Sequence, residues 1–282
     1  MNKRTHNSMV VFSLFFCLAL PWNVRAGESS QALVFGFLPI LSPQKLVARF
    51  GPLTDYLAEQ LNRPVRLETA PNYEEFVRRT SKQRYDILFT APHFYYLAQR
   101  QSGYRVLVRV DAPTMPAVIV ARKDSDIHNL EDLRGKKLST VDPLALGTAL
   151  VKAHLSANNI DPDKDVTLVT TPTHNASLLS AYKRVTDAAS LMLPPYNRAK
   201  PEIKNNMIII AKTAGTPHMP ISVSSSVSAE KRSIIENALL NLTASTKGKE
   251  LLQHLSWPGF AKTSPAEYDQ LEWAAKQIQL TE

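Results

Sequence analysis

The sequence predicts an α/β protein built from two domains, and three observations support this. First, short apolar runs alternate with amphipathic stretches from residue 32 onward, which is typical of parallel βαβ units. Second, a length of 282 residues corresponds to about two domains. Third, two proline-rich segments, 112–116 and 213–220, break the alternation. We therefore expect residues 117–214 to be inserted, through two crossover segments, into a first domain made of 27–113 plus 220–282.

Ten short apolar runs are predicted to be strands. They are residues 33–37, 65–69, 86–89, 106–110, 118–121, 137–141, 166–170, 188–191, 207–210 and 221–223. The first helix is expected to begin at Ser42-Pro43 and to be interrupted at Gly51-Pro52. After residue 223 only helices are expected, and Ser264 to Glu267 forms a capping box for one of them.

Residues 1–26 have the pattern of an export signal. Lys3 and Arg4 precede a largely apolar run over 9–20, and Ala26 supplies a small residue at the cleavage position. The run is too short for a spanning helix, which needs about 20 apolar residues. We therefore predict a periplasmic protein that is cleaved after Ala26.

The excess of basic residues shrinks once the signal is removed. The whole chain has 33 Lys and Arg against 25 Asp and Glu, which gives +8. Loss of Lys3, Arg4 and Arg25 leaves 30 − 25 = +5. The remaining basic residues are scattered, and an exported protein meets no DNA or RNA, so no nucleic-acid partner is expected. The single cysteine, Cys17, lies in the signal, which excludes a disulfide framework and a multi-thiolate metal site.

No familiar catalytic motif is present. HExxH, GxSxG, the P-loop and GxGxxG are all missing, and nine glycines in the whole chain leave little for a phosphate-binding loop. The histidines after the signal are not spaced three or four apart, as helical metal ligands are. We therefore predict a binding protein with no catalytic residues, no cofactor and no metal. An exported enzyme that depends on His174 is a further alternative.

Polar and aromatic residues follow the predicted strands at five places. In open α/β sheets, ligands bind beyond the carboxyl ends of the strands, where helix starts present free N–H groups. We therefore expect a small-molecule site in the cleft between the two domains. The residues predicted to line it are Pro39, Tyr73, Thr90, His93, Tyr95, Leu146, Gly147, Thr148, His174 and Asn175. Each of these residues also admits a purely structural role, as a helix cap or a core residue.

Seven short motifs in order along the chain carry a resemblance to a known family. They are Phe35-Gly-Phe-Leu-Pro39, Pro52-Leu53-x-x-Tyr56-Leu57, Ala70-Pro-Asn-Tyr73, Tyr85-Asp-Ile-Leu-Phe-Thr-Ala-Pro92-x-x-Tyr95, Leu130-Glu-Asp-Leu-Arg-Gly-Lys136, Thr173-His174 with Asp187-Ala188-Ala189, and Gly259-Phe260 with Tyr268-Asp269. The sequence thereby resembles the phosphonate/phosphite-binding proteins of ABC importers, which are type 2 periplasmic binding proteins. That resemblance implies a two-lobed fold that closes on a small ligand and delivers it to an ABC permease. It also places Tyr73, Tyr95 and His174 at positions that contact ligand.

One stretch departs from the family pattern. The family's "D-P-x-S-T-S-G" supplies hydroxyls that hold the phosphonate oxygens, but here Leu144, Ala145 and Leu146 stand between Asp142-Pro143 and Gly147. A phosphonate-like or phosphite-like oxyanion remains the expected ligand, and a more apolar small solute is the alternative. A sensory protein that presents its ligand to a membrane histidine kinase fits the same sequence.

Overall fold

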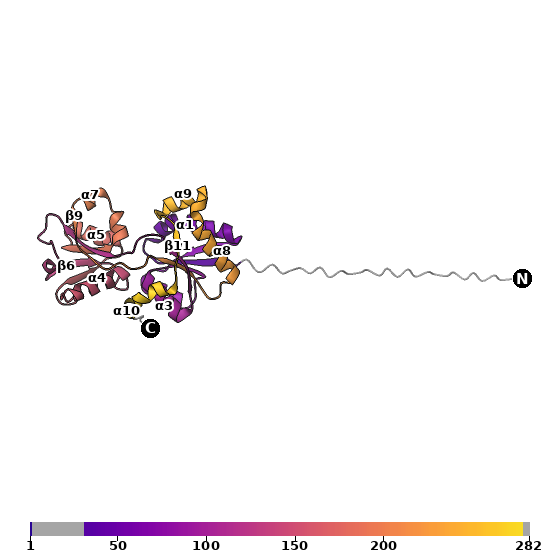
Figure 1. Ribbon diagram of the computed structural model, residues 1–282, viewed down its shortest axis with the longest axis horizontal. Coiled ribbons are helices and arrows are strands. Elements are labelled where there is room, and N and C mark those ends of the chain that lie inside the picture. Colours follow the sequence, from indigo (N-terminus) through magenta and orange to yellow (C-terminus); the bar gives the residue numbers. More distant parts are fainter. Residues whose placement is uncertain (2–30, 279–282) are drawn as a thin grey trace. The chain divides into compact units, whose positions relative to one another are not determined.

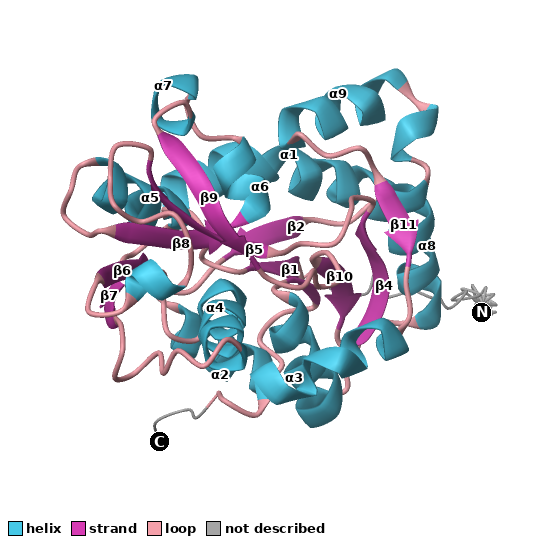
Figure 2. Cartoon of the chain, turned by 60° about the vertical axis from the view of Figure 1, so that its left-hand side comes forward, coloured by secondary structure: helices cyan, strands magenta, loops and turns pink. Residues whose placement is uncertain are grey.

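The computed structural model describes residues 31–278, together with Met1. The rest of the predicted signal, including the cleavage position after Ala26, lies outside the described residues. Residues 31–278 form two β-sheets with helices packed against them (Figure 1, Figure 2). Among the described residues, no helix combines the length and the apolar character that crossing a membrane requires.

The first sheet of the described chain has six strands in the order β11-β4-β10-β3-β1-β2. β1, β2 and β3 run parallel, as the βαβ pattern predicts. The returning chain adds β10, antiparallel to both β3 and β4, and β11, antiparallel to β4. The strand bounds are β1 Leu33–Phe37, β2 Val65–Glu68, β3 Ile87–Phe89, β4 Arg105–Val110, β10 Pro220–Val223 and β11 Phe260–Lys262.

Helices cover both faces of this sheet. In Figure 2, α1 and α9 lie above it and α3 lies below it. One face packs around Phe37, Phe50 and Leu239, the other around Phe76 and Phe94. Figure 1 shows that α1, from the start of the chain, lies beside α8 and α9, from its end. The bounds are α1 Pro43–Leu61, α2 Tyr73–Ser81, α3 Pro92–Ser102, α8 Ala229–Leu240, α9 Thr246–Leu255 and α10 Glu272–Ala275, with 3₁₀ segments η2 Leu242–Ala244 and η3 Pro265–Leu271.

The second sheet, within the described residues, has five strands in the order β7-β6-β8-β5-β9. β6 runs parallel to β7 and β8, whereas β5 is antiparallel to β8 and β9. The bounds are β5 Ala117–Arg122, β6 Lys137–Thr140, β7 Thr167–Thr170, β8 Ala188–Met192 and β9 Met207–Lys212. The helices are α4 Leu146–Ala157, α5 His174–Tyr182, α6 Leu193–Asn197 and α7 Pro201–Lys204, with a 3₁₀ turn η1 at Glu131–Leu133.

Two segments connect the sheets, one between β4 and β5 and one between β9 and β10. They bond to each other: Met115 N donates to Thr216 O at 2.8 Å, and Thr216 N donates to Met115 O at 3.2 Å. They also approach closely, because a Cβ on Gly215 would lie only 2.3 Å from Thr114 Oγ1. Both segments coincide with the proline-rich breaks in the sequence. The domain boundaries drawn at those breaks stay a prediction.

Two expectations about individual elements are wrong. α1 is not interrupted at Gly51-Pro52 but continues to Leu61. Proline has no N–H for the carbonyl of Ala48, four residues earlier. His254 Nε2 supplies one N–H there instead, and it lies 3.0 Å from Ala48 O and 3.1 Å from Arg49 O. The chain after residue 223 is also not purely helical, because β11 pairs with β4.

Candidate functional site

The carboxyl ends of β1 and β3 lie side by side. Phe37 is in register with Phe89, and Leu38 N donates to Phe89 O at 3.1 Å. Pro39, just beyond β1, is half-buried, and Thr90, just beyond β3, is fully buried. The Thr90 hydroxyl has no hydrogen-bond partner in the protein. A buried hydroxyl without a partner is unfavourable, so this end of the sheet can accommodate a polar group supplied from outside the chain.

His93 connects the two sheets. It lies in the first turn of α3 with 1% of its surface exposed, and its Nε2 is 2.9 Å from Leu144 O, in the segment before α4. A carbonyl only accepts, so Nε2 carries the hydrogen and Nδ1 of the neutral ring is an acceptor. Nδ1 is buried and has no partner. Burial lowers the pKa of His93 to about 4, against the opposing effect of the Leu144 bond, so the ring is neutral at neutral pH.

Tyr73 faces the same segment. It is the first residue of α2, and its ring packs edge-on against Phe94, with the centroids 5.8 Å apart. Burial, and then the charge of Asp142, raises the pKa of the phenol. Tyr73 and Leu144 also pack against the same apolar core, which contains Leu38 and Phe94.

The start of α4 meets the start of α5. A Cβ on Gly147 would lie 3.3 Å from Met192 Sδ and 3.7 Å from His174 Cε1, so the glycine leaves His174 close to the α4 backbone. His174 is half-buried, and its Nδ1 is buried without a partner. Burial, and then the charge of Arg198, lowers its pKa to about 4. The structure thus places Gly147 and His174 together, and their role in ligand binding stays a prediction.

Four other predicted residues have different surroundings. Leu146 is buried in the core around α4, and Asn175 is exposed. Thr148 Oγ1 donates to Val141 O at 3.3 Å. The ring of Tyr95 packs edge-on against Tyr268, its hydroxyl accepts from Val106 N at 3.3 Å, and burial raises its pKa to about 12. A ligand role for these side chains stays a prediction.

A separate cavity of about 420 Å³ lies at the two connecting segments. Arg109 pairs there with Glu267 at 3.2 Å. His218 Nδ1 accepts from Met219 N at 2.8 Å, and burial lowers the His218 pKa to about 4. No sequence motif marks this cavity, and the predicted site residues are not part of its lining: Arg109, Ala112, Pro113, Thr114, Gly215, Pro217, His218, Glu267 and Gln270.

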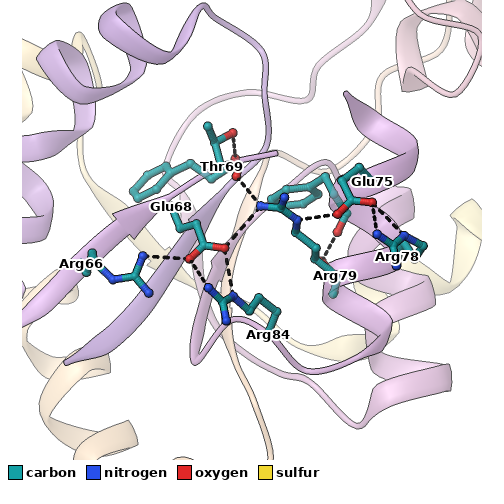
Figure 3. Close-up of polar contacts among 10 residues, drawn as sticks. Arg66, Glu68, Thr69, Glu75, Arg78, Arg79 and Arg84 are labelled. Atoms are coloured by element: carbon teal, nitrogen blue, oxygen red, sulfur yellow. Dashed lines mark hydrogen bonds and ion pairs between the residues drawn. The ribbon is translucent and has the colours of Figure 1, made fainter. Parts of the chain in front are cut away.

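Four arginines on β2, on α2 and in the turn after α2 form a separate network (Figure 3). Glu68 pairs with Arg66 at 2.9 Å, with Arg84 at 3.1 Å and with Arg79 at 3.4 Å. Arg79 also pairs with Glu75, as Arg78 does (Figure 3). Each of these four arginines therefore has a carboxylate partner, although only two carboxylates serve the four guanidinium groups. Across residues 31–278, no three His, Cys, Asp or Glu side chains gather closely enough to hold a metal ion.

Comparison with known families shows to which protein family this chain belongs. A model of the periplasmic phosphonate substrate-binding proteins of ABC transporters matches residues 35–268. The chain belongs to that family. Its members are substrate-binding proteins of the periplasm, so the resemblance read from the seven motifs is confirmed. A curated member, the phosphonates-binding periplasmic protein of Escherichia coli (strain K12), is 24% identical over 277 residues, which cover 94% of this chain and 82% of that protein.

Solved structures share the fold. The binding protein component of a phosphonate ABC transporter from Pseudomonas aeruginosa has a TM-score of 0.77 at 21% identity and covers 87% of each chain. PhnD1 from Prochlorococcus marinus (MIT 9301), in complex with methylphosphonate, has a TM-score of 0.80 at 16% identity, over 88% of this chain and 98% of that one. The predicted two-lobed α/β fold of a type 2 periplasmic binding protein is therefore confirmed.

Proposed function

We propose that this protein binds a phosphonate or a related oxyanion, such as phosphite, between its two sheets and delivers it to an ABC permease. One observation carries the proposal: Thr90 Oγ1, His93 Nδ1 and His174 Nδ1 are buried and lack partners. All three belong to residues beyond the strands, where this family is expected to hold its ligand. Hydrogen bonds from a charged ligand contribute about 1.5–3 kcal/mol each, which would offset the unfavourable burial of these atoms.

The atoms match an oxyanion in a specific way. The Thr90 hydroxyl and a His174 N–H are donors for anionic oxygens. His93 Nδ1 is an acceptor because Nε2 donates to Leu144 O, so it suits a protonated ligand oxygen. Leu144, Ala145 and Leu146 stand where the family has hydroxyl donors. The backbone N–H groups at the start of α4 would therefore be the donors to the oxyanion at this place.

Export and closure of the two lobes belong to the same proposed function. Residues 1–26 act as an export signal cleaved after Ala26. The lobes are 27–113 plus 220–282 and 117–214, and they close by bending at the two bonded connecting segments. The protein binds its ligand without converting it.

Calorimetry and thermal unfolding test the proposal. Methylphosphonate or phosphite at 100 times Kd should stabilise the protein by about 2.7 kcal/mol, whereas small amines should not. Thr90→Val removes one hydroxyl at nearly constant volume and should weaken binding by about tenfold or more. His128→Ala, at an exposed histidine, is the control and should bind normally. No response to either oxyanion at millimolar concentration would refute the proposal.

A more apolar ligand is the second candidate, because of one contact. Leu144 stands where the family carries a hydroxyl, and it packs against the apolar core that contains Leu38 and Phe94. In the same assay, a butylphosphonate that binds more tightly than methylphosphonate would favour this candidate. Equal or weaker binding would exclude it.

A further inference from the structure

The cavity at the two connecting segments has the dimensions of a binding site. Its volume of about 420 Å³ falls within the range of roughly 300–1,000 Å³ that is usual for small-molecule sites. Residues of both connecting segments and of η3 contribute to its lining. A molecule held there would therefore contact both segments at once.

Two of the lining residues, Arg109 and His218, lie on the same side of the first sheet. Pro220 is in register with Arg109 where β10 pairs with β4, and His218 comes two residues before Pro220. Val110 N donates to Met219 O at 3.1 Å, which extends the pairing beyond β10. His218 is therefore a diagonal neighbour of Arg109, and such neighbours are within reach of long side chains.

His218 contributes one unused N–H to the cavity. Only 8% of its surface is exposed, and its Nδ1 accepts from Met219 N at 2.8 Å. Burial, and then the charge of Arg109, lowers the pKa of His218 to about 4, so the ring is neutral at neutral pH. A neutral ring whose Nδ1 accepts carries its hydrogen on Nε2. Within residues 31–278, no hydrogen bond uses that Nε2 hydrogen.

Arg109 also has unused donors, although it pairs with Glu267. Its Nε donates to Glu267 Oε2 at 3.2 Å, and its Nη1 donates to Val110 O at 3.2 Å. A guanidinium has five N–H groups, and no bond among the described residues uses Nη2 of Arg109. Both oxygens of Glu267 have partners, because Oε1 accepts from Ser264 N at 3.3 Å. The unused groups of Arg109 and His218 are thus N–H donors, which suit the oxygens of an anion.

We propose that this cavity binds a small carboxylic acid, and that the bound acid holds the two connecting segments together. The carboxylate accepts from Arg109 Nη2 and His218 Nε2. Its short apolar chain lies against the part of the wall that is formed by Ala112, Pro113 and Pro217. The site is separate from the residues predicted to line the cleft, and it does not depend on which ligand the cleft binds.

Butyrate and butyramide, which have the same shape but differ in charge, test the site by NMR. Butyrate should shift the His218 Cε1 proton signal in a saturable manner, whereas butyramide should leave it unchanged. Glu267→Gln removes the negative charge beside Arg109 but keeps a side chain that can complete the capping box. It should tighten butyrate binding by about tenfold, and Arg109→Gln should weaken it by about tenfold or more. Arg105→Gln, at an exposed arginine of the same strand, is the matched control.

Hydrogen exchange tests the effect on the connecting segments. Met115 N and Thr216 N each donate to the other segment, so exchange of these two amides reports how often the segments separate. Butyrate at about ten times Kd should slow this exchange by about tenfold. Unchanged exchange would show that the acid does not hold the segments together.

Two further outcomes would overturn the proposal. One is an equal response to butyrate and butyramide, including no response to either. The other is a change of butyrate affinity in the same direction in Glu267→Gln and Arg109→Gln. Circular dichroism confirms that each variant is folded, and if Arg109→Gln does not fold, the expected gain of affinity in Glu267→Gln decides. No measurement uses methylphosphonate or phosphite, so failure here leaves the proposed function unaffected.

Discussion

The Nε2 atom of His93, in α3, lies 2.9 Å from the carbonyl oxygen of Leu144, and this bond joins the helices of the six-stranded sheet to the start of α4. His93 therefore contributes to the arrangement of the two sheets as well as to the predicted ligand site. Its other nitrogen, Nδ1, is left buried and without a partner.

Replacing His93 should weaken both folding and ligand binding. His93→Ala removes the donor to Leu144 O and should lower the free energy of unfolding by about 1–3 kcal/mol. The same substitution removes Nδ1, the acceptor proposed for the ligand, and should weaken methylphosphonate binding by about tenfold or more. Calorimetry gives the affinity and urea denaturation the stability, with His128→Ala as the control. Unchanged affinity would show that Nδ1 does not face the ligand.

The buried histidines predict acid sensitivity. Burial lowers the pKa values of His93, His174 and His218 to about 4, from 6.5. Between these values the unfolded chain binds more protons than the folded chain, so stability is complete above about pH 6.5 and is lost as the pH falls toward 4. His93 alone should account for about 3 kcal/mol of this loss. Urea denaturation at several pH values measures it, and His93→Gln should reduce the slope. An equal slope in the variant would contradict the assignment to His93.

Ligand binding should reverse the pKa shift of His174. An anion beside the imidazole favours its charged form, so methylphosphonate should raise the pKa of His174 from about 4. NMR titration of the His174 Cε1 proton, with and without ligand, measures this change. The exposed His128 serves as the internal reference. If the two His174 titrations coincide, the oxyanion lies elsewhere.

Gly36 should tolerate no side chain. A Cβ on Gly36 would lie 2.4 Å from Cγ of the buried Tyr85 ring, which stacks on Phe76. Gly36→Ala should therefore lower the free energy of unfolding by about 3 kcal/mol. Gly51→Ala is the matched control, because nothing lies within 4 Å of its Cβ position in α1, and it should raise stability by up to about 1 kcal/mol. Equal stabilities of the two variants would contradict this account.

Most of the strands and the class of fold could be predicted because their signals are local. All ten expected strands are present, since each is an apolar run bounded by turns or helix starts. β11 was missed because Phe260–Lys262 is only three residues long and forms by pairing with β4. The continuity of α1 through Pro52 depends on His254, which lies more than 200 residues away along the chain.

The candidate site could be predicted only in part, because some of its contacts join residues that are distant in the sequence. Thr90, Gly147 and His174 follow from the rule that ligands bind at strand ends and helix starts. The bond from His93 to Leu144 links residues from different sheets. No local pattern marks that pair. Tyr95 was predicted from its position in a motif. The motif does not reveal that the Tyr95 hydroxyl accepts a hydrogen bond from Val106 N within the protein.

The position of β10 has a consequence for the order in which the protein is completed. β10 lies between β3 and β4, yet it is made only after the whole of the second sheet. A nascent chain that ends before Pro220 therefore has a gap in the middle of its first sheet, with the edges of β3 and β4 unpaired. The six-stranded sheet therefore cannot close until Pro220–Val223 has been made, so the first strands of the chain wait for its last third before they reach their final pairing.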